Sequence, residues 1–224
     1  MTTRRLQIAS RKQPKQARSA ALVAAILEAA TQVLSEEGAA RFTSARVAEK
    51  AGVSVGSIYQ YFPNKASILF RLQVDEWMQT TRMLRNILED ASTPPLERLR
   101  TLVHAFLHSE CEEAEIRGAL NDAAPLYRDS PEVQKAQAEG DRMIDTFIAE
   151  VLPMASASSR EQAGDLIMTT LSTVGNEFSR TRRTKAEIKA YADEMADMFC
   201  AYLKTCAGRP RGTPSRNTRT YPPH

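Results

Sequence analysis

Apolar residues recur along most of this chain at the three- and four-residue spacing of an amphipathic helix. No stretch shows the sustained alternation of a half-buried strand, and no Asn-Gly or Asp-Gly hairpin turn occurs. The first helical pattern begins near Val23 and ends at Gly38, where glycine favours a helix C-terminus. The pattern therefore predicts an all-α protein of about nine helices.

Helix-start signals separate the apolar segments. Serine or threonine followed by proline, or by glutamate three residues later, is typical of a helix N-terminus. Such signals are Thr93-Pro94, Ser130-Pro131, Ser158 with Glu161, and Thr184 with Glu187. They divide the C-terminal two thirds of the chain into several helices.

Two long helices are predicted near the C-terminus, over about 160–180 and 185–205. Each carries an apolar stripe that can pack on its own core or join a second copy in a four-helix bundle, and the sequence leaves both open. The candidate dimerisation residues are Leu166, Thr170, Val174, Phe178, Tyr191, Met195, Met198 and Tyr202.

The formal net charge of +3 conceals a strong asymmetry. Residues 1–65 hold ten basic and four acidic side chains, residues 66–203 hold 15 basic and 23 acidic, and residues 204–224 hold five basic and no acidic. A basic N-terminal part beside an acidic body indicates an anionic polymer or surface as partner.

A basic N-terminus is also found in targeting peptides, and Ala20–Leu27 resembles the apolar core of one. Glu28 interrupts this run, however, and helical spacing continues to Leu34, which favours a helix inside a domain. No stretch approaches the roughly 18 apolar residues of a membrane span. We therefore expect a cytoplasmic protein with no membrane partner, and three cysteines without a CxxC pair agree with that compartment.

The segment from Thr43 to Lys65 predicts two short helices joined by a glycine turn. Thr43 or Ser44 caps the first helix, Ser54 caps the second, and Gly52 lies in the turn. The expected buried positions are Val47, Ala48, Ala51, Ile58 and Phe62. Two helices at this spacing form a helix-turn-helix, whose second helix enters the major groove of DNA.

The second short helix presents side chains suited to DNA. Small residues allow a close approach to base edges, and hydroxyl and amide groups reach phosphates or bases. Its expected exposed residues are Val55, Gly56, Ser57, Tyr59, Gln60 and Tyr61. Lys65 opens the next helix beside Asn64, where the positive end of the helix dipole attracts a phosphate. A helical hairpin without a ligand is the alternative, which the basic flanks disfavour.

Residues 18–70 resemble the DNA-binding segment of the TetR (tetracycline-repressor) family of transcriptional regulators. The residues that carry the resemblance are Thr43, Val47-Ala48, Ala51-Gly52-Val53-Ser54, Gly56, Ile58-Tyr59, Tyr61-Phe62 and Asn64-Lys65. The rest of the chain agrees with the family in length and helical character. The resemblance implies a homodimeric regulator with a three-helix N-terminal DNA-binding domain and a helical C-terminal ligand-binding and dimerisation domain.

The resemblance also implies roles for individual residues. Ser44, Tyr59, Tyr61 and Lys65 are expected to hold phosphates, and Val55, Gly56, Ser57 and Gln60 are expected to face bases. Thr43, Arg46 and Ser54 complete the expected DNA-binding set.

Two positions depart from the family's pattern. Ala45 stands where some members place a base-reading side chain, which shifts reading to Arg46 or to groove shape. Ala66 and Ser67 follow Lys65 where an acid is common, which is expected to weaken the helix cap.

The chain is thus expected to comprise a disordered basic arm (1–15), a helix-turn-helix domain (16–65), a helical effector-binding and dimerisation domain (66–206) and a disordered basic tail (207–224). The arm either enters the minor groove or remains solvated, and both possibilities stay open.

An effector pocket within the C-terminal helices is implied by the resemblance. Candidate lining residues are Trp77, Met78, Phe106, Tyr127, Met143, Phe147 and Met168, for which ordinary core packing is the alternative. His104 and His108 share a helix face with Cys111 one turn further, a spacing that permits metal binding. A structural histidine pair is the favoured interpretation, and we expect neither a metal nor a cofactor.

The sequence therefore predicts a ligand-responsive transcriptional regulator. We expect a repressor that binds a palindromic operator as a homodimer and is released by a small-molecule effector of unknown identity. The alternative is a non-regulatory helical enzyme or binding protein with basic tails. No nucleophile–base pair and no glycine-rich phosphate loop is recognisable, so the chain is not expected to be an enzyme.

Overall fold

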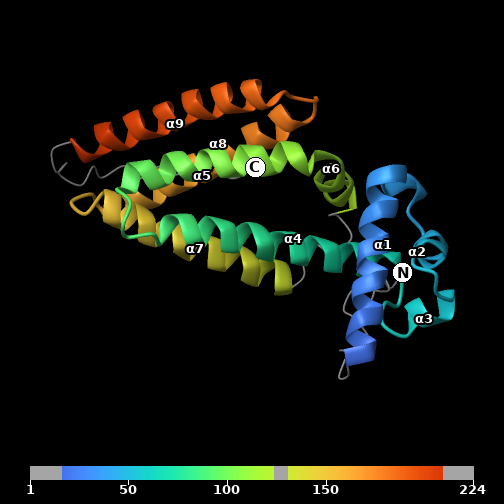
Figure 1. The fold of residues 1–224 in the computed structure, drawn as a ribbon. Coiled ribbons are helices and arrows are strands. Elements are labelled where there is room, and N and C mark those ends of the chain that lie inside the picture. Colours follow the sequence, from blue (N-terminus) through green and yellow to red (C-terminus); the bar gives the residue numbers. More distant parts are fainter. Residues whose placement is uncertain (1–16, 124–130, 209–224) are drawn as a thin grey trace, which may run out of the picture.

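A computed structural model describes residues 17–123 and 131–208 of the chain. These ranges contain nine helices and no strand, which confirms the all-α fold class (Figure 1). The helices are α1 (Ala17–Arg41), α2 (Ser44–Lys50), α3 (Val55–Tyr59), α4 (Lys65–Leu88), α5 (Pro95–Glu112), α6 (Ala114–Ala123), α7 (Pro131–Val151), α8 (Ala157–Ser179) and α9 (Lys185–Ala207). The predicted basic arm, most of the predicted tail, Tyr127 and Ser130 lie outside the described residues.

Side-chain caps begin most of these helices. Thr43 and Ser54 cap α2 and α3 as predicted, and Thr184 forms the predicted capping box of α9 with Glu187. Two predictions are wrong. Ser156, rather than Ser158, caps α8, because its hydroxyl accepts from the backbone N–H of Ser159 at 3.2 Å.

The second wrong prediction concerns the start of α5. Pro94 occupies the N-cap position and makes no side-chain capping bond. Thr93 instead donates its hydroxyl to Asp90 at 2.8 Å, within the turn that precedes the helix. This turn satisfies the hydroxyl of Thr93 locally, so the helix starts one residue later than the sequence pattern indicates.

Gly38 interrupts α1 near its end. Its φ of 73° lies in the left-handed region that glycine adopts without strain, so the helix kinks there and resumes for one short turn. The predicted stop at Gly38 therefore corresponds to a kink that redirects the chain toward α2.

The described helices form two hydrophobic cores. The first unites α1, α2 and α3 with the N-terminal half of α4 and the buried residues Ala119 and Leu120 of α6. The second unites the C-terminal end of α4 with α5, α7, α8 and α9. Helix α4 thus contributes to both cores and crosses the boundary predicted at residues 65–66.

Helix α5 occupies the centre of the second core. It contacts α4, α6, α7, α8 and α9, and α8 and α9 lie on it rather than chiefly on each other. Figure 1 shows α1–α3 gathered at one end of the molecule, with α4 running from them along the body and α6 next to α1. The end formed by α1–α3, which contains the predicted helix-turn-helix and is called the DNA-binding end below, is therefore joined to the body through α4 and α6.

Helix α1 alone among the described helices is long and apolar enough to cross a membrane by length and hydropathy. The expectation that no stretch has this character is thus wrong for α1. Its buried side chains, Val23, Ile26, Ala29, Ala30, Val33 and Leu34, form one side of the first core. This apolar stripe is the packing surface of the DNA-binding end.

Gly175 sets the distance between α8 and α5. A methyl group placed on it would lie 3.0 Å from Cε1 of Phe106 and 3.4 Å from Cδ2 of Leu107. We expect Gly175→Ala to lower the free energy of unfolding by about 1 kcal/mol, because the packed core must yield to the added atom. Urea denaturation measures this loss.

Gly140→Ala in α7 is the matched control, because no atom lies within 4 Å of the added methyl group. The control is expected to gain about 0.5–1 kcal/mol from alanine's helix propensity. Equal urea midpoints for the two variants would contradict the close packing at Gly175.

Candidate DNA-binding site and effector cavity

The helix-turn-helix is built from α2, a tight turn and α3. Gly52 has a φ of 65° in the turn, and the N–H of Val53 donates back to the carbonyl of Ala48 at 3.0 Å. Val47 and Ile58 are fully buried between the two helices. The turn and the buried pair fix α3 on the first core with its opposite side in solvent.

The solvent side of α3 carries the predicted base-facing residues. Val55 is 37% exposed and Tyr59 43% exposed, and Gly56 and Gln60 are exposed beside them. The hydroxyls of Ser54 and Ser57 lie 2.9 Å apart, so these small side chains also stabilise the helix start. The surface predicted to face DNA is therefore a short helix with small residues at its N-terminal end.

Two residues expected to hold phosphates are buried instead. Tyr61 is 6% exposed and belongs to the first core, and Ser44 is 8% exposed. The exposure predicted for Tyr61 is therefore wrong. Tyr61 follows the end of α3, where the chain turns inward toward α4, so its ring fills the core beside Phe62.

The start of α4 is better capped than the sequence suggests. Asn64 accepts from the N–H of Ser67 at 2.9 Å, and the side chain of Ser67 returns to the backbone of Asn64. These bonds form a capping box, so the expected weakening of the cap by Ser67 is wrong. Lys65 is exposed in the first turn, where its ammonium group and the helix dipole both attract a phosphate.

The basic residues of α2 are turned toward α1. Arg46 lies 3.6 Å from Glu37, and Lys50 lies 2.9 Å from Glu36. These exposed pairs contribute little stability but place the two cations beside α1. Arg46 stays 55% exposed and is accessible to DNA, whereas the ammonium group of Lys50 faces an acid.

The stripes on α8 and α9 divide between the core and the surface. Leu166 and Met198 are about half exposed, and Tyr191 is exposed and stacks on Phe178 with 4.2 Å between ring centroids. Thr170, Val174 and Tyr202 are partly exposed. Met195 is 5% exposed within its own second core and does not reach a dimerisation surface.

The residues predicted to line an effector pocket are not gathered in one place. Trp77 and Phe106 line one cavity, Met168 lines another between α7 and α8, and Met78 is 40% exposed. Met143 packs against the second core. Phe147 is buried in that core, with the guanidinium of Arg98 5.6 Å from its ring centroid. Phe147 is therefore a core residue, as the alternative to pocket lining predicts.

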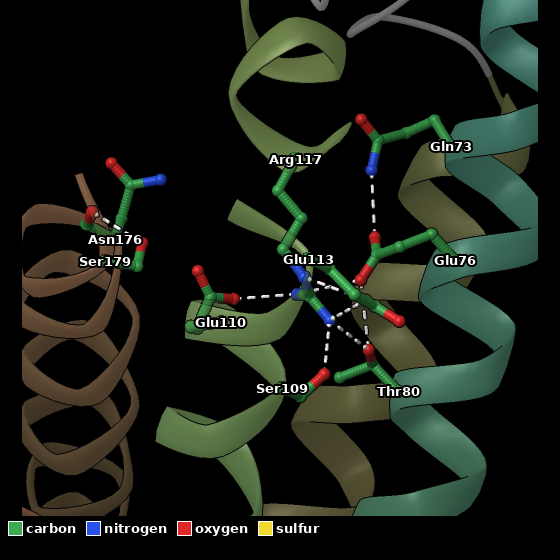
Figure 2. Close-up of polar contacts among 9 residues, drawn as sticks. All are labelled: Gln73, Glu76, Thr80, Ser109, Glu110, Glu113, Arg117, Asn176 and Ser179. Atoms are coloured by element: carbon green, nitrogen blue, oxygen red, sulfur yellow. Dashed lines mark hydrogen bonds and ion pairs between the residues drawn. The ribbon is translucent and has the colours of Figure 1, made fainter. Parts of the chain in front are cut away.

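The cavity at Trp77 and Phe106 has a volume of about 700 Å³ and lies between α4, α5 and α8. A cluster of polar side chains meets at its end (Figure 2). Arg117 of α6 reaches down to Glu76 of α4 at 2.8 Å and to Glu110 of α5 at 2.7 Å. Its side chain is 12% exposed, so this ion-pair cluster is largely withdrawn from water.

The remaining donors of Arg117 are also engaged. Its Nε and Nη2 atoms donate to Glu113, and Nη2 donates to Ser109 and Thr80 at 2.8 and 3.2 Å. Burial raises the pKa of Glu76 and of Glu110, and the positive charge of Arg117 opposes this rise in both. The carboxylates of Glu76 and Glu110 therefore depend on Arg117 as their counter-ion.

Sequence reasoning missed this cluster. Glu76, Glu110 and Arg117 lie on three helices, and the i,i+4 spacing of Glu113 and Arg117 was the one local signal. This spacing usually gives a solvent-exposed ion pair, whereas here the orientation of α6 directs the Arg117 side chain into the interior.

His104 and His108 engage separate carboxylates. His104 lies 3.0 Å from Asp193 of α9, and His108 lies 3.2 Å from Glu112 of its own helix. No group of three or more potential metal ligands occurs among the residues that were described. The predicted role as a structural pair remains an expectation, with His104 linking α5 to α9.

Comparison with known families identifies the class of protein. Residues 26–72 match the family described as bacterial regulatory proteins, tetR family, and residues 94–206 match the tetracyclin repressor-like C-terminal domain. The chain therefore belongs to the TetR family of helix-turn-helix transcriptional regulators, as the sequence resemblance implied.

Curated relatives match over part of the chain. The nucleoid occlusion factor SlmA of Vibrio campbellii is 39% identical over 84 residues, which are 37% of this chain and 42% of that protein. The chain thus matches about two fifths of the length of this relative.

Solved structures share most of the fold at low identity. A TetR-family regulator from Pectobacterium atrosepticum has a TM-score of 0.64 at 21% identity, covering 88% of this chain and 100% of that one. FadR from Bacillus subtilis, solved with stearoyl-CoA, has a TM-score of 0.61 at 16% identity, covering 79% and 96%. These likenesses show that the chain shares its fold with those proteins over the part that is covered.

Removing the counter-ion should destabilise the fold in a pH-dependent way. We expect Arg117→Met to lower the free energy of unfolding by about 3 kcal/mol at pH 7, because Glu76 and Glu110 lose their buried partner. Without Arg117 both carboxyl groups have still higher pKa values in the fold, so the folded state takes up protons as the pH falls. Urea denaturation at several pH values should show the loss shrinking toward pH 5.

Arg180→Met is the control, because Arg180 pairs with Glu177 where both side chains are about 70% exposed. Its effect should stay within about 0.5 kcal/mol. A loss for Arg117→Met that is the same at every pH would contradict the buried-carboxylate explanation.

Proposed function

We propose that this protein is a ligand-responsive one-component transcriptional regulator, most simply a repressor, that acts on DNA in the cytoplasm. The observation that carries the proposal is the position of α6. Its residues Ala119 and Leu120 belong to the core of the DNA-binding end, whereas Arg117 belongs to the polar cluster at the cavity. A small molecule in the cavity thus has a direct physical connection to the DNA-binding helices.

Coupling through α6 follows ordinary linkage. An effector that binds better to an arrangement in which α6 has shifted makes that arrangement more populated. Because α6 packs on α1, its shift moves the support of α3 and changes the position of the recognition helix. The effector then weakens DNA binding, because it binds more tightly to the arrangement in which the recognition helix is displaced.

A homodimer is the second part of the proposal. Leu166 and Met198 are large apolar side chains about half exposed on the two C-terminal helices, where a second copy can cover them in a four-helix bundle. A two-fold dimer places two copies of α3 on one side of the DNA, about 34–36 Å apart. The operator is accordingly an inverted repeat.

The relatives support an effector of small-molecule size. B. subtilis FadR, whose fold this chain shares, was solved with stearoyl-CoA bound. The family to which this chain belongs consists of regulators, and the expectation that the protein is not an enzyme rests on that membership.

DNA binding is expected to depend on the exposed residues at α3 and α4. Lys65→Ala and Tyr59→Ala should each weaken binding to DNA of any sequence, because both remove phosphate contacts. Lys65→Ala should also reduce the slope of log affinity against log salt by about one. Fluorescence anisotropy over a range of salt concentrations measures both effects.

Lys50→Ala is the control, because it removes the same charge from an ammonium group that pairs with Glu36. Its affinity and salt slope should change much less than those of Lys65→Ala. If Lys50→Ala and Lys65→Ala lost equal affinity, net charge rather than the placement of Lys65 would govern binding.

Dimerisation is expected to depend on the exposed apolar face. Leu166→Asp should yield monomers in sedimentation velocity, because the substitution leaves a carboxylate inside the proposed bundle. Met154→Asp is the control, since Met154 is 63% exposed in the link before α8. A dimeric Leu166→Asp protein would place the dimer interface elsewhere.

A further inference from the structure

The cavity between α4, α5 and α8 has one charged end and two aromatic walls. Trp77 and Phe106 line it together with Glu76, Glu110 and Asn176, and its volume is about 700 Å³. A volume of this size suits a compact organic molecule. The nature of that molecule follows from the charges and hydrogen-bonding groups around the cavity.

Negative charge is in excess at the charged end. Arg117 faces three carboxylates, those of Glu76, Glu110 and Glu113. The other guanidinium that lines the cavity, on Arg180, is paired with Glu177, which also lines the cavity. The largely buried carboxylates of Glu76 and Glu110 therefore share one guanidinium group, whose positive charge does not balance the negative charge of the cluster.

Glu110 carries the open position of the cluster. Its side chain is 8% exposed, and its Oε1 atom accepts from Arg117 at 2.7 Å. Its Oε2 atom takes part in no hydrogen bond within the described part of the chain. Figure 2 shows this oxygen turned away from Arg117, on the side of Glu110 that faces Asn176 and α8. A carboxylate oxygen that opens onto a cavity is a strong acceptor for a charged donor.

Arg117 itself has no capacity left for an anion. Its Nε and both terminal nitrogens already interact with the carboxylates of Glu76, Glu110 and Glu113 or the hydroxyls of Thr80 and Ser109. A ligand carboxylate or phosphate would have to displace one of these buried acids and would add to the negative charge. The cluster therefore disfavours an anionic ligand.

We propose that this cavity binds an organic amine, whose ammonium group donates to Oε2 of Glu110 and whose apolar body lies against Trp77 and Phe106. The ammonium group supplies the missing positive charge, and the rings offer both apolar surface and cation–π attraction. This inference rests on the proposed function, because it assigns a ligand class to the effector cavity.

The ligand also acts on α6. A second cation at Glu110 shares the carboxylate with Arg117 and weakens the attraction that holds Arg117 in place. Arg117 holds α6 against α4 and α5 through its ion pairs. Amine binding therefore weakens the attachment of α6, which packs against α1.

Three indoles of nearly equal size and different charge provide the test. Tryptamine is a cation at pH 7, tryptophol is neutral and indole-3-acetate is an anion. Isothermal titration calorimetry of the full chain without DNA should show binding of tryptamine at least about tenfold tighter than that of tryptophol. Both ligands can donate a hydrogen bond to the carboxylate, and only tryptamine adds the attraction between opposite charges. Indole-3-acetate should bind more weakly than both.

Glu110→Gln identifies the acceptor. The amide keeps the size of the side chain, and its carbonyl oxygen can still accept from Arg117. Tryptamine affinity should fall about tenfold or more in this variant. Glu112→Gln, which changes a 64% exposed acid on the same helix, should bind tryptamine like the parent protein.

The outcomes separate this inference from the proposed function. Equal binding of the three indoles, preference for the anion, or unchanged tryptamine binding in Glu110→Gln would overturn the amine assignment. Failure of tryptamine, benzylamine and 9-aminoacridine to bind would overturn it as well. None of these results affects DNA binding, which anisotropy measures on its own, so the regulator proposal stands or fails separately.

Discussion

Arg117 lies where α4, α5 and α6 meet, and its guanidinium group is the counter-ion for carboxylates on two of these helices. A buried acid without a counter-ion is costly, so the position of Arg117 constrains the position of α6. Because Ala119 and Leu120 on the same helix belong to the core of the DNA-binding end, that constraint extends to α1. The geometry of the two parts of the molecule therefore depends on this ion-pair cluster as well as on α4, which contributes to both cores.

The DNA-binding end is stabilised mostly by short-range interactions. Hydroxyl or amide caps begin α2, α3 and α4, and Gly52 forms the turn that lets α3 cross α2. A five-residue helix such as α3 has little stability of its own, so its caps and its buried Ile58 hold it in place. This arrangement leaves small residues on the outer side, where a double helix can approach closely.

The body is arranged around α5, with tight packing on one side and a hollow on another. Gly175 brings α8 close to Phe106, whereas the cavity opens beside the same ring. The ring of Phe106 thus belongs both to the packed core and to the cavity wall. A ligand that displaces this ring therefore also displaces core residues, because the tightly packed core has little free space.

The sequence determined the helices, their caps at Thr43, Ser54 and Thr184, and the helix-turn-helix, because these depend on neighbours within a few residues. It was insufficient for Tyr61, whose burial depends on the direction of the chain after α3, and for Ser67, whose cap depends on the geometry at Asn64. Tertiary structure alone brought Glu76 to Glu110 and Arg117, since α4 is separated along the chain from the consecutive helices α5 and α6. The pairing of Glu76 with Arg117 has no local signal, because it is the packing of α4 against α5 and α6 that creates it.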